Sequence, residues 1–188
     1  METRLVLCAI SAFCSGSMSE ESGIWFFKRA RKAVLLAADR PSVSSANAFF
    51  WIYVFSMIMG RDEIGIPFLK MAVDIVINLR FYIDPDDSPW LVGLNETEKE
   101  ERRRLFWALC MTSRCEIGRS LGWGLQELST DHMKLLRPIP GAFKEMHYYQ
   151  EFCEVHSLII AIKRHHSSAP NSIQDMLSSP ELLTLHMH

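Results

Sequence analysis

The chain has 188 residues, of which 48% are hydrophobic and 22% charged, and its 20 basic side chains stand against 22 acidic ones. That length is sufficient for one domain with a sizeable core. The slightly acidic balance excludes a global electrostatic field that would attract nucleic acid or anionic lipid, so any affinity for DNA would have to be local.

The cysteines and the apolar runs indicate the broad class of the protein. Five cysteines without a Cys-x-x-Cys pair are typical of reduced thiols in a reducing compartment. The longest uncharged apolar run, Ala48–Met59, is shorter than the stretch of about 20 residues that spans a bilayer. The first residues, "RLVLCAISAFCSGS", imitate a signal peptide, but we favour the buried first helix of a domain.

Apolar side chains recur at helical spacing along the chain, and no stretch shows sustained alternation of apolar and polar residues. The pattern predicts an all-α fold, an irregular multi-helix domain of about six to eight helices. We expect this helical domain over residues 1–166 and a loosely ordered tail over residues 167–188, where Ser and Pro are frequent.

The first amphipathic helix is predicted over residues 22–38. Its apolar face is opposite the basic run "KRARK" at residues 28–32, and the Asp39-Arg40-Pro41 segment ends the helix because the residue before proline avoids the helical conformation. The basic run resembles a nuclear-localisation patch. A solvated helix face is the alternative, and the charge pattern favours it.

Two further helices are predicted, one from a cap among residues 42–45 to Gly60 and one over residues 64–80 with Pro67 in its first turn. The segment "DPDDSP" at residues 84–89 predicts a turn. Aromatic residues crowd the first of these helices, and they either form plain core, which their density favours, or line a ligand pocket. The candidate lining residues are Phe50, Trp51 and Phe55.

A fourth long helix contains "ETEKEERRRLFWALC" at residues 96–110. Asn95 and Glu98 predict a capping box at its start, and Thr97 with Glu100 offers the same box in a shifted register. Residues 96–104 hold four Glu, one Lys and three Arg, and the pairs Glu98–Arg102 and Glu100–Arg104 have the favourable spacing. We therefore expect glutamates of the same helix to form ion pairs with the arginines. This charge pairing argues against DNA binding by this segment.

Candidate catalytic and metal-binding residues are few. Ser120 lies in a G-x-S-x-G pattern with Asp131 and His132 after it, but that hydrolase motif needs a preceding strand, and none is predicted. Cys153 and His156 share a helix face, yet no four-ligand set accompanies them, so a half-buried thiol and a surface imidazole are expected. The residues predict no enzyme, no metal site and no cofactor in this chain.

Four segments in order resemble the regulatory domain of fungal zinc-cluster transcription factors, also called the middle homology or xylanolytic activator regulatory domain. They are the amphipathic pair of helices from "FFKRARK" to "FSMIMG", then "FLKMAVDIVINLRFYIDP", then "EKEERRRLFWALCMTSR", then "LSTDHMKLLRPIP". The third is the most specific. The resemblance covers about residues 5–140 and implies a structural signature of Arg103, Arg104, Phe106, Trp107 and Arg114, in which the arginines form ion pairs around the helix.

The chain departs from this family's pattern at several positions. Ser113 stands where the family usually has Asp, Arg80 replaces a glycine, and Tyr82 replaces a histidine. Trp123-Gly124 replaces an Arg-Pro pair. Ser113 puts part of the polar signature network in doubt, because a hydroxyl cannot replace a carboxylate as the partner of an arginine.

The resemblance implies a nuclear protein that regulates transcription through intramolecular contacts, through the transcription machinery or a regulatory protein, or through a small-molecule effector. The family reads DNA with a six-cysteine cluster that holds zinc, and no such spacing occurs in this sequence. We therefore expect zinc and DNA binding only from a module absent here, and both a fragment and a relative without that module remain open. A stand-alone helical small-molecule-binding protein or enzyme is the alternative.

Overall fold

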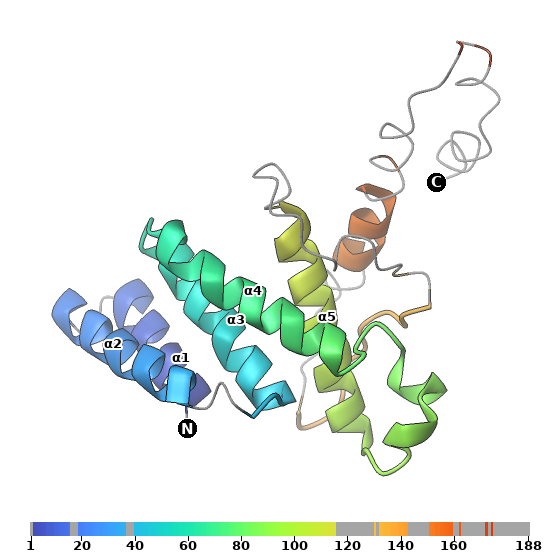
Figure 1. The fold of residues 1–188 in the computed structure, drawn as a ribbon, viewed down its shortest axis with the longest axis horizontal. Helices are drawn as coiled ribbons and strands as arrows, with labels where there is room; N and C mark the ends of the chain where they lie inside the picture. The colour runs from blue at the N-terminus through green and yellow to red at the C-terminus, as the bar shows by residue number, and fades with distance from the viewer. Residues whose placement is uncertain are drawn as a thin grey trace. The chain divides into compact units, whose positions relative to one another are not determined.

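The computed structural model describes residues 2–15, 19–36, 40–115, 132–142 and 151–159, with residues 130, 162, 172 and 174 singly. These residues are mostly helical and form no β-strand, so the predicted all-α class is confirmed. The elements in chain order are α1 (Glu2–Ser15), α2 (Glu20–Leu36), α3 (Val43–Ile58), α4 (Asp62–Asn78), the short 3₁₀ helices η1 (Pro85–Asp87) and η2 (Pro89–Leu91), and α5 (Glu96–Cys115); Figure 1 labels the α-helices.

The chain divides into two compact units, Met1–Met133 and Lys134–His188. The first unit contains all the labelled helices, and the described part of the second includes a helical segment at residues 151–159. The predicted domain over residues 1–166 and the predicted tail after it remain predictions, since Ser172 and Gln174 are the tail residues that the structure describes.

Within the first unit the helices pack as neighbours in chain order. Helix α1 lies against α2 and α3, α3 lies along α4, and α4 leads through η1 and η2 to α5 (Figure 1). Helix α2 buries the apolar face that its spacing predicts, and large side chains fill the interior of the unit. The buried side chains include Phe27, Ala30, Val34, Phe49, Ile52, Phe55, Leu69, Ala72, Val76, Phe106, Trp107 and Leu109.

Helix α3 has the predicted start and end. The backbone N–H of Ser45 donates to the Ser42 hydroxyl at 3.0 Å, and the N–H of Ser42 donates to the Ser45 hydroxyl at 2.8 Å, which forms a reciprocal capping box. At the other end Gly60 has a φ of +65°, and the N–H of Arg61 donates to the Ser56 carbonyl at 2.9 Å. This is a Schellman ending with glycine at the left-handed position.

Helix α4 begins at Asp62, two residues earlier than expected, so the prediction that Pro67 lies in the first turn is wrong. Pro67 lies in the second turn, where it leaves the Glu63 carbonyl without its helical donor. Both residues are exposed, so water can satisfy that carbonyl. Tertiary packing supports the early start, because Gly65 lies so close to α3 that an added Cβ would be 2.8 Å from Ser56 Cβ.

Helix α4 also ends in a Schellman motif, but without glycine. Arg80 occupies the left-handed position with a φ of +54°. Its N–H donates to the Ile77 carbonyl and the N–H of Phe81 donates to the Val76 carbonyl, both at 3.0 Å. The buried Phe81 and Val76 supply the apolar contact that accompanies this ending. Arg80 therefore stands where the sequence resemblance has a glycine, and the backbone there requires the conformation that glycine favours.

Candidate functional site

The predicted capping box fixes the start of α5. The backbone N–H of Asn95 donates to Glu98 Oε2, and the N–H of Glu98 donates to Asn95 Oδ1, each at 2.9 Å. Of the two capping boxes that the sequence offers, the one between Asn95 and Glu98 therefore forms. The acidic first turn of α5, which includes Glu96, faces the positive end of the helix dipole. This cap fixes the first turn of α5, ahead of the arginines.

Helix α5 carries a buried cation, Arg103, which is 1% exposed. Its Nε donates to Asp84 Oδ2 at 2.8 Å, its Nη2 donates to Asp84 Oδ1 at 2.7 Å, and Nη2 also donates to Asp86 Oδ2 at 2.8 Å. Asp84 is fully buried and also accepts the backbone N–H of Asp86 at 3.0 Å, which caps η1. The paired hydrogen bonds to Asp84 raise the pKa of Arg103, although burial acts in the opposite direction.

Four further ion pairs extend this arrangement along α5. Arg104 Nε lies 3.1 Å from Oε1 of the fully buried Glu100, whose Oε2 lies 3.8 Å from Arg103 Nη1. Lys99 Nζ donates to Asp86 Oδ1 at 2.9 Å and to Glu96 Oε1 at 3.1 Å. The hydrogen bonds to Asp86 and Glu96 raise the pKa of Lys99. We call the whole set the ion-pair cluster: Asp84, Asp86, Lys99, Glu100, Arg103 and Arg104.

The predicted Glu98–Arg102 pair is wrong. Glu98 caps the helix, while Arg102 Nη2 donates to the Leu79 carbonyl at 3.2 Å and its guanidinium carbon lies 3.9 Å from the Phe81 ring centroid. Burial lowers the pKa of Arg102. Local charge balance therefore explains Arg104, which does pair with Glu100, but Arg102 and Arg103 donate hydrogen bonds to the end of α4 and the segment that follows it.

The remaining signature residues lie around the same helix. Phe106 and Trp107 are buried, with ring centroids 6.5 Å apart in an edge-to-face arrangement. Ser113, at the position where the resemblance has Asp, is buried and donates to the Cys110 carbonyl at 3.2 Å. The hydroxyl is thus satisfied by its own helix. The side chain of Arg114 lies outside the described side chains, so its predicted ion pair remains a prediction.

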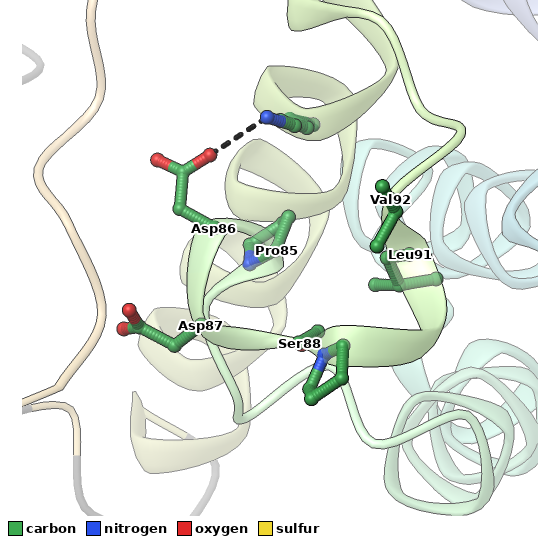
Figure 2. Close-up of a pocket in the computed structure, with 8 residues that line it drawn as sticks. Pro85, Asp86, Asp87, Ser88, Leu91 and Val92 are labelled. Atoms are coloured by element: carbon green, nitrogen blue, oxygen red, sulfur yellow. Dashed lines mark hydrogen bonds and ion pairs between the residues drawn. The ribbon is translucent and has the colours of Figure 1, made fainter.

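A pocket of about 310 Å³ lies beside the ion-pair cluster (Figure 2). Four apolar side chains form part of its wall, and the dashed line at Asp86 in Figure 2 marks the ion pair with Lys99. Because Lys99 is held by two carboxylates, it is poorly placed to act as a nucleophile. The pocket therefore suits binding better than catalysis. Its lining residues are Pro85, Asp86, Asp87, Ser88, Pro89, Leu91, Val92 and Lys99.

The predicted aromatic pocket residues lie elsewhere. Phe55 is fully buried, and its ring centroid lies 4.6 Å from that of Phe27. Phe50 and Trp51 are half-buried with ring centroids 5.8 Å apart. None of the three lines the pocket beside α5. That they line another cavity stays a prediction. The observed pocket was not predicted, because its segment "DPDDSP", with two prolines, predicted only a turn.

The other candidate residues do not assemble into a site in the part of the chain that the structure describes. Ser120 and Asp131 lie outside the described residues, and His132 is exposed. Cys153 and His156 are both buried in the second unit, so the expected surface imidazole is wrong. Among the described residues no three His, Cys, Asp or Glu side chains are grouped as metal ligands would be, and no described helix has the length and apolarity of a membrane span.

Comparison with known proteins yields one informative relative. No family model and no solved structure matches the chain. A curated protein of Saccharomyces cerevisiae (strain ATCC 204508 / S288c), the TY1 enhancer activator, is 24% identical over 116 residues. The match covers 57% of this chain and 15% of that protein, so the chain corresponds to a small part of its relative. The similarity therefore links the chain to a transcription activator.

Proposed function

We propose that this chain is the regulatory domain of a fungal transcription factor and acts in the nucleus. The observation that carries the proposal is the similarity to the TY1 enhancer activator over 116 residues. The four sequence segments that resemble the zinc-cluster regulatory domain point to the same role. The chain is not proposed as an enzyme, and zinc and sequence-specific DNA contacts are assigned to the module of that family that this sequence lacks.

The ion-pair cluster supports the proposal because it gives a physical reason for residues in the second and third of these segments. Asp84 lies near the end of the second segment and Arg103 lies in the third, and their side chains form the buried bidentate pair. A planar guanidinium matches a carboxylate in this geometry, which the ammonium of Lys could not reproduce. The residue types that carry the resemblance are therefore those that the fold requires at these positions.

The same cluster suggests how the domain could respond to a partner or an effector. Asp86 is bound by both Arg103 and Lys99, and it also lines the pocket beside α5. Anything that occupies the pocket or moves the segment of residues 84–92 would therefore act directly on the ion pairs of α5. A regulatory protein, the transcription machinery or a small-molecule effector could use this connection, and none of these contacts requires the chain itself to bind DNA.

A reporter assay tests the proposed role. The chain would be placed between a bacterial DNA-binding domain and a weak activation domain, and reporter transcription compared with the same fusion without it. We expect the chain to change transcription and expect Arg103→Met, which breaks the ion-pair cluster, to remove the effect. Lys70→Met alters an exposed pair and should keep it at equal protein level. An unchanged reporter with the folded wild-type chain would contradict the proposal.

A second measurement addresses DNA directly. The purified chain should show no sequence-selective binding to duplex DNA at physiological salt, since Arg102, Arg103 and Arg104 are engaged within the fold. Tight selective binding would refute this part of the proposal.

The alternative, a stand-alone helical small-molecule-binding protein or enzyme, is favoured by the pocket beside α5. It predicts a ligand whose binding depends on the pocket while the reporter stays unaffected. An enzyme acting through Ser120 would lose its activity in Ser120→Ala, whereas we expect any esterase activity to be the same in that variant.

A further inference from the structure

Helix α2 has two opposite faces. One is buried and includes Phe27, Ala30 and Val34. On the opposite side, at steps of four, three and four residues, lies a set that we call the α2 stripe, in which the two end residues are apolar and the two central ones are basic. Trp25 is 51% exposed, Leu36 is 77% exposed, and the two cations are exposed as well, so the α2 stripe comprises Trp25, Arg29, Lys32 and Leu36.

The side chains of the α2 stripe have the composition of an interface. The guanidinium of Arg29 lies 4.6 Å from the centroid of the Trp25 ring, which holds the indole on the surface through a cation–π contact. Trp and Arg are the residues that most often dominate binding energy at protein interfaces. An exposed Trp and Leu on one stripe are also costly to leave in water, since each presents a large apolar area.

The basic run "KRARK" does not act as one unit in the folded chain. Arg31 turns away from the α2 stripe, with its guanidinium carbon 5.7 Å from the ring centroids of both Phe27 and Phe68. Lys28, Arg29 and Lys32 are exposed. A receptor that binds an extended basic segment would have to unfold α2 to reach all five residues. The surface therefore fits recognition as a folded helix.

The charge of α2 identifies the chemistry of its partner. The helix holds two acidic and four basic residues, a net charge of +2, whereas the whole chain has a net charge of −2. No carboxylate of the described residues forms an ion pair with Lys28, Arg29 or Lys32. We propose that the α2 stripe is a docking surface for an acidic, apolar peptide segment of a partner protein, which would meet the two cations with carboxylates and cover Trp25 and Leu36 with apolar side chains.

A peptide fits the α2 stripe better than a membrane or a nucleic acid does. Inserting Trp25 and Leu36 into a bilayer would carry Arg29 and Lys32, which lie between them, into the apolar region. A phosphate backbone would satisfy the two cations but would leave the exposed indole and the Leu36 side chain without apolar contact. An acidic segment with apolar side chains satisfies all four positions. The proposal does not depend on the role of the chain in transcription.

Fluorescence anisotropy with the full chain tests the proposal. The probe is a fluorescein-labelled peptide that repeats the unit Asp-Phe-Glu-Leu. We expect Trp25→Ala and Lys32→Glu each to weaken binding by about tenfold or more. The matched controls are Trp90→Ala and Arg61→Glu, which should change binding less than about twofold. Trp90 is 52% exposed beneath Arg80, and Arg61 is an exposed cation outside α2.

Altered probes separate the possible occupants. A peptide with Asn and Gln in place of the acidic residues, and one with Ser in place of Phe and Leu, should both bind more weakly than the probe. Equal losses in the test and control variants would overturn the proposal, as would equal binding of the three peptides. Displacement of the probe by duplex DNA or by phosphatidylserine vesicles at physiological salt, at lower concentration than unlabelled peptide, would assign the α2 stripe to those partners instead.

Discussion

The guanidinium of Arg103 and the carboxylate of Asp84 form a bidentate ion pair with both side chains excluded from solvent. The two residues are 19 positions apart and belong to different segments. Because a buried charge is tolerated only with a well-oriented partner, this pair ties the connection after α4 to one register on α5. It also holds one wall of the adjoining pocket in place, since Asp86, which lines the pocket, binds the same guanidinium.

Breaking the pair from the Arg103 side should destabilise the domain strongly. We expect Arg103→Met to lower the free energy of unfolding by about 3–5 kcal/mol, because Asp84 would remain buried without its partner. Arg103→Lys should also be costly, since an ammonium cannot make both parallel hydrogen bonds. Urea denaturation measures these effects. Lys70→Met is the control, as its pair with Asp74 is exposed, and a comparable loss there would contradict the interpretation.

The two ends of α5 should respond differently to truncation. Trp107→Ala should cost about 3–5 kcal/mol, because the side chain is 1% exposed. The sequence predicts a cost under about 1 kcal/mol for Arg102→Ala if Arg102 were an exposed helix pair. Its contacts with the Leu79 carbonyl and the Phe81 ring instead lead us to expect about 1–3 kcal/mol. Denaturant melts distinguish the two expected costs. An Arg102→Ala variant as stable as the wild type would show that these contacts contribute little.

The left-handed residue at the end of α4 offers a stabilising substitution. Arg80→Gly should be more stable than Arg80→Ala by about 1 kcal/mol, since a side chain is disfavoured at a φ of +54°. The comparison with alanine removes the contribution of the Arg80 guanidinium over the Trp90 ring from both variants. Thermal unfolding checks the difference. Gly60→Ala, at a φ of +65° with no atom near the added Cβ, should lose a similar amount.

The close approach of α3 and α4 at Gly65 should be intolerant of any side chain. Gly65→Ala would place its Cβ 2.8 Å from Ser56 Cβ and 3.1 Å from Tyr53 Cα, so we expect a loss of about 1–3 kcal/mol despite the better helix propensity of alanine. Gly93→Ala is the control, because no atom lies within 4 Å of its added Cβ. If chemical denaturation gave equal stability for both variants, the helices would not be in contact as described.

The sequence predicted several local features well. The caps at Ser42 and Asn95 and the glycine ending at Gly60 follow from short-range backbone chemistry, which a few neighbouring residues fix. The first residue of α4 was missed, because the packing of Gly65 against α3 favours a helix that propensity alone would start after Asp62. Propensity is a weak guide where tertiary contacts compete with it.

The sequence by itself determined the all-α class and the apolar face of α2, and it suggested a resemblance to transcription regulators, because periodicity and motif order are properties of neighbouring residues. The spacing also predicted the Glu100–Arg104 pair, but only the tertiary structure decided the partners of Arg102 and Arg103. Glu98 and Arg102 have the right spacing on α5, yet Glu98 caps the helix and Arg102 turns to Leu79 and Phe81. Arg103 donates its bidentate hydrogen bonds to Asp84, which is 19 residues away in sequence. A buried charge is stable only beside a well-oriented partner, and that partner need not be near in sequence.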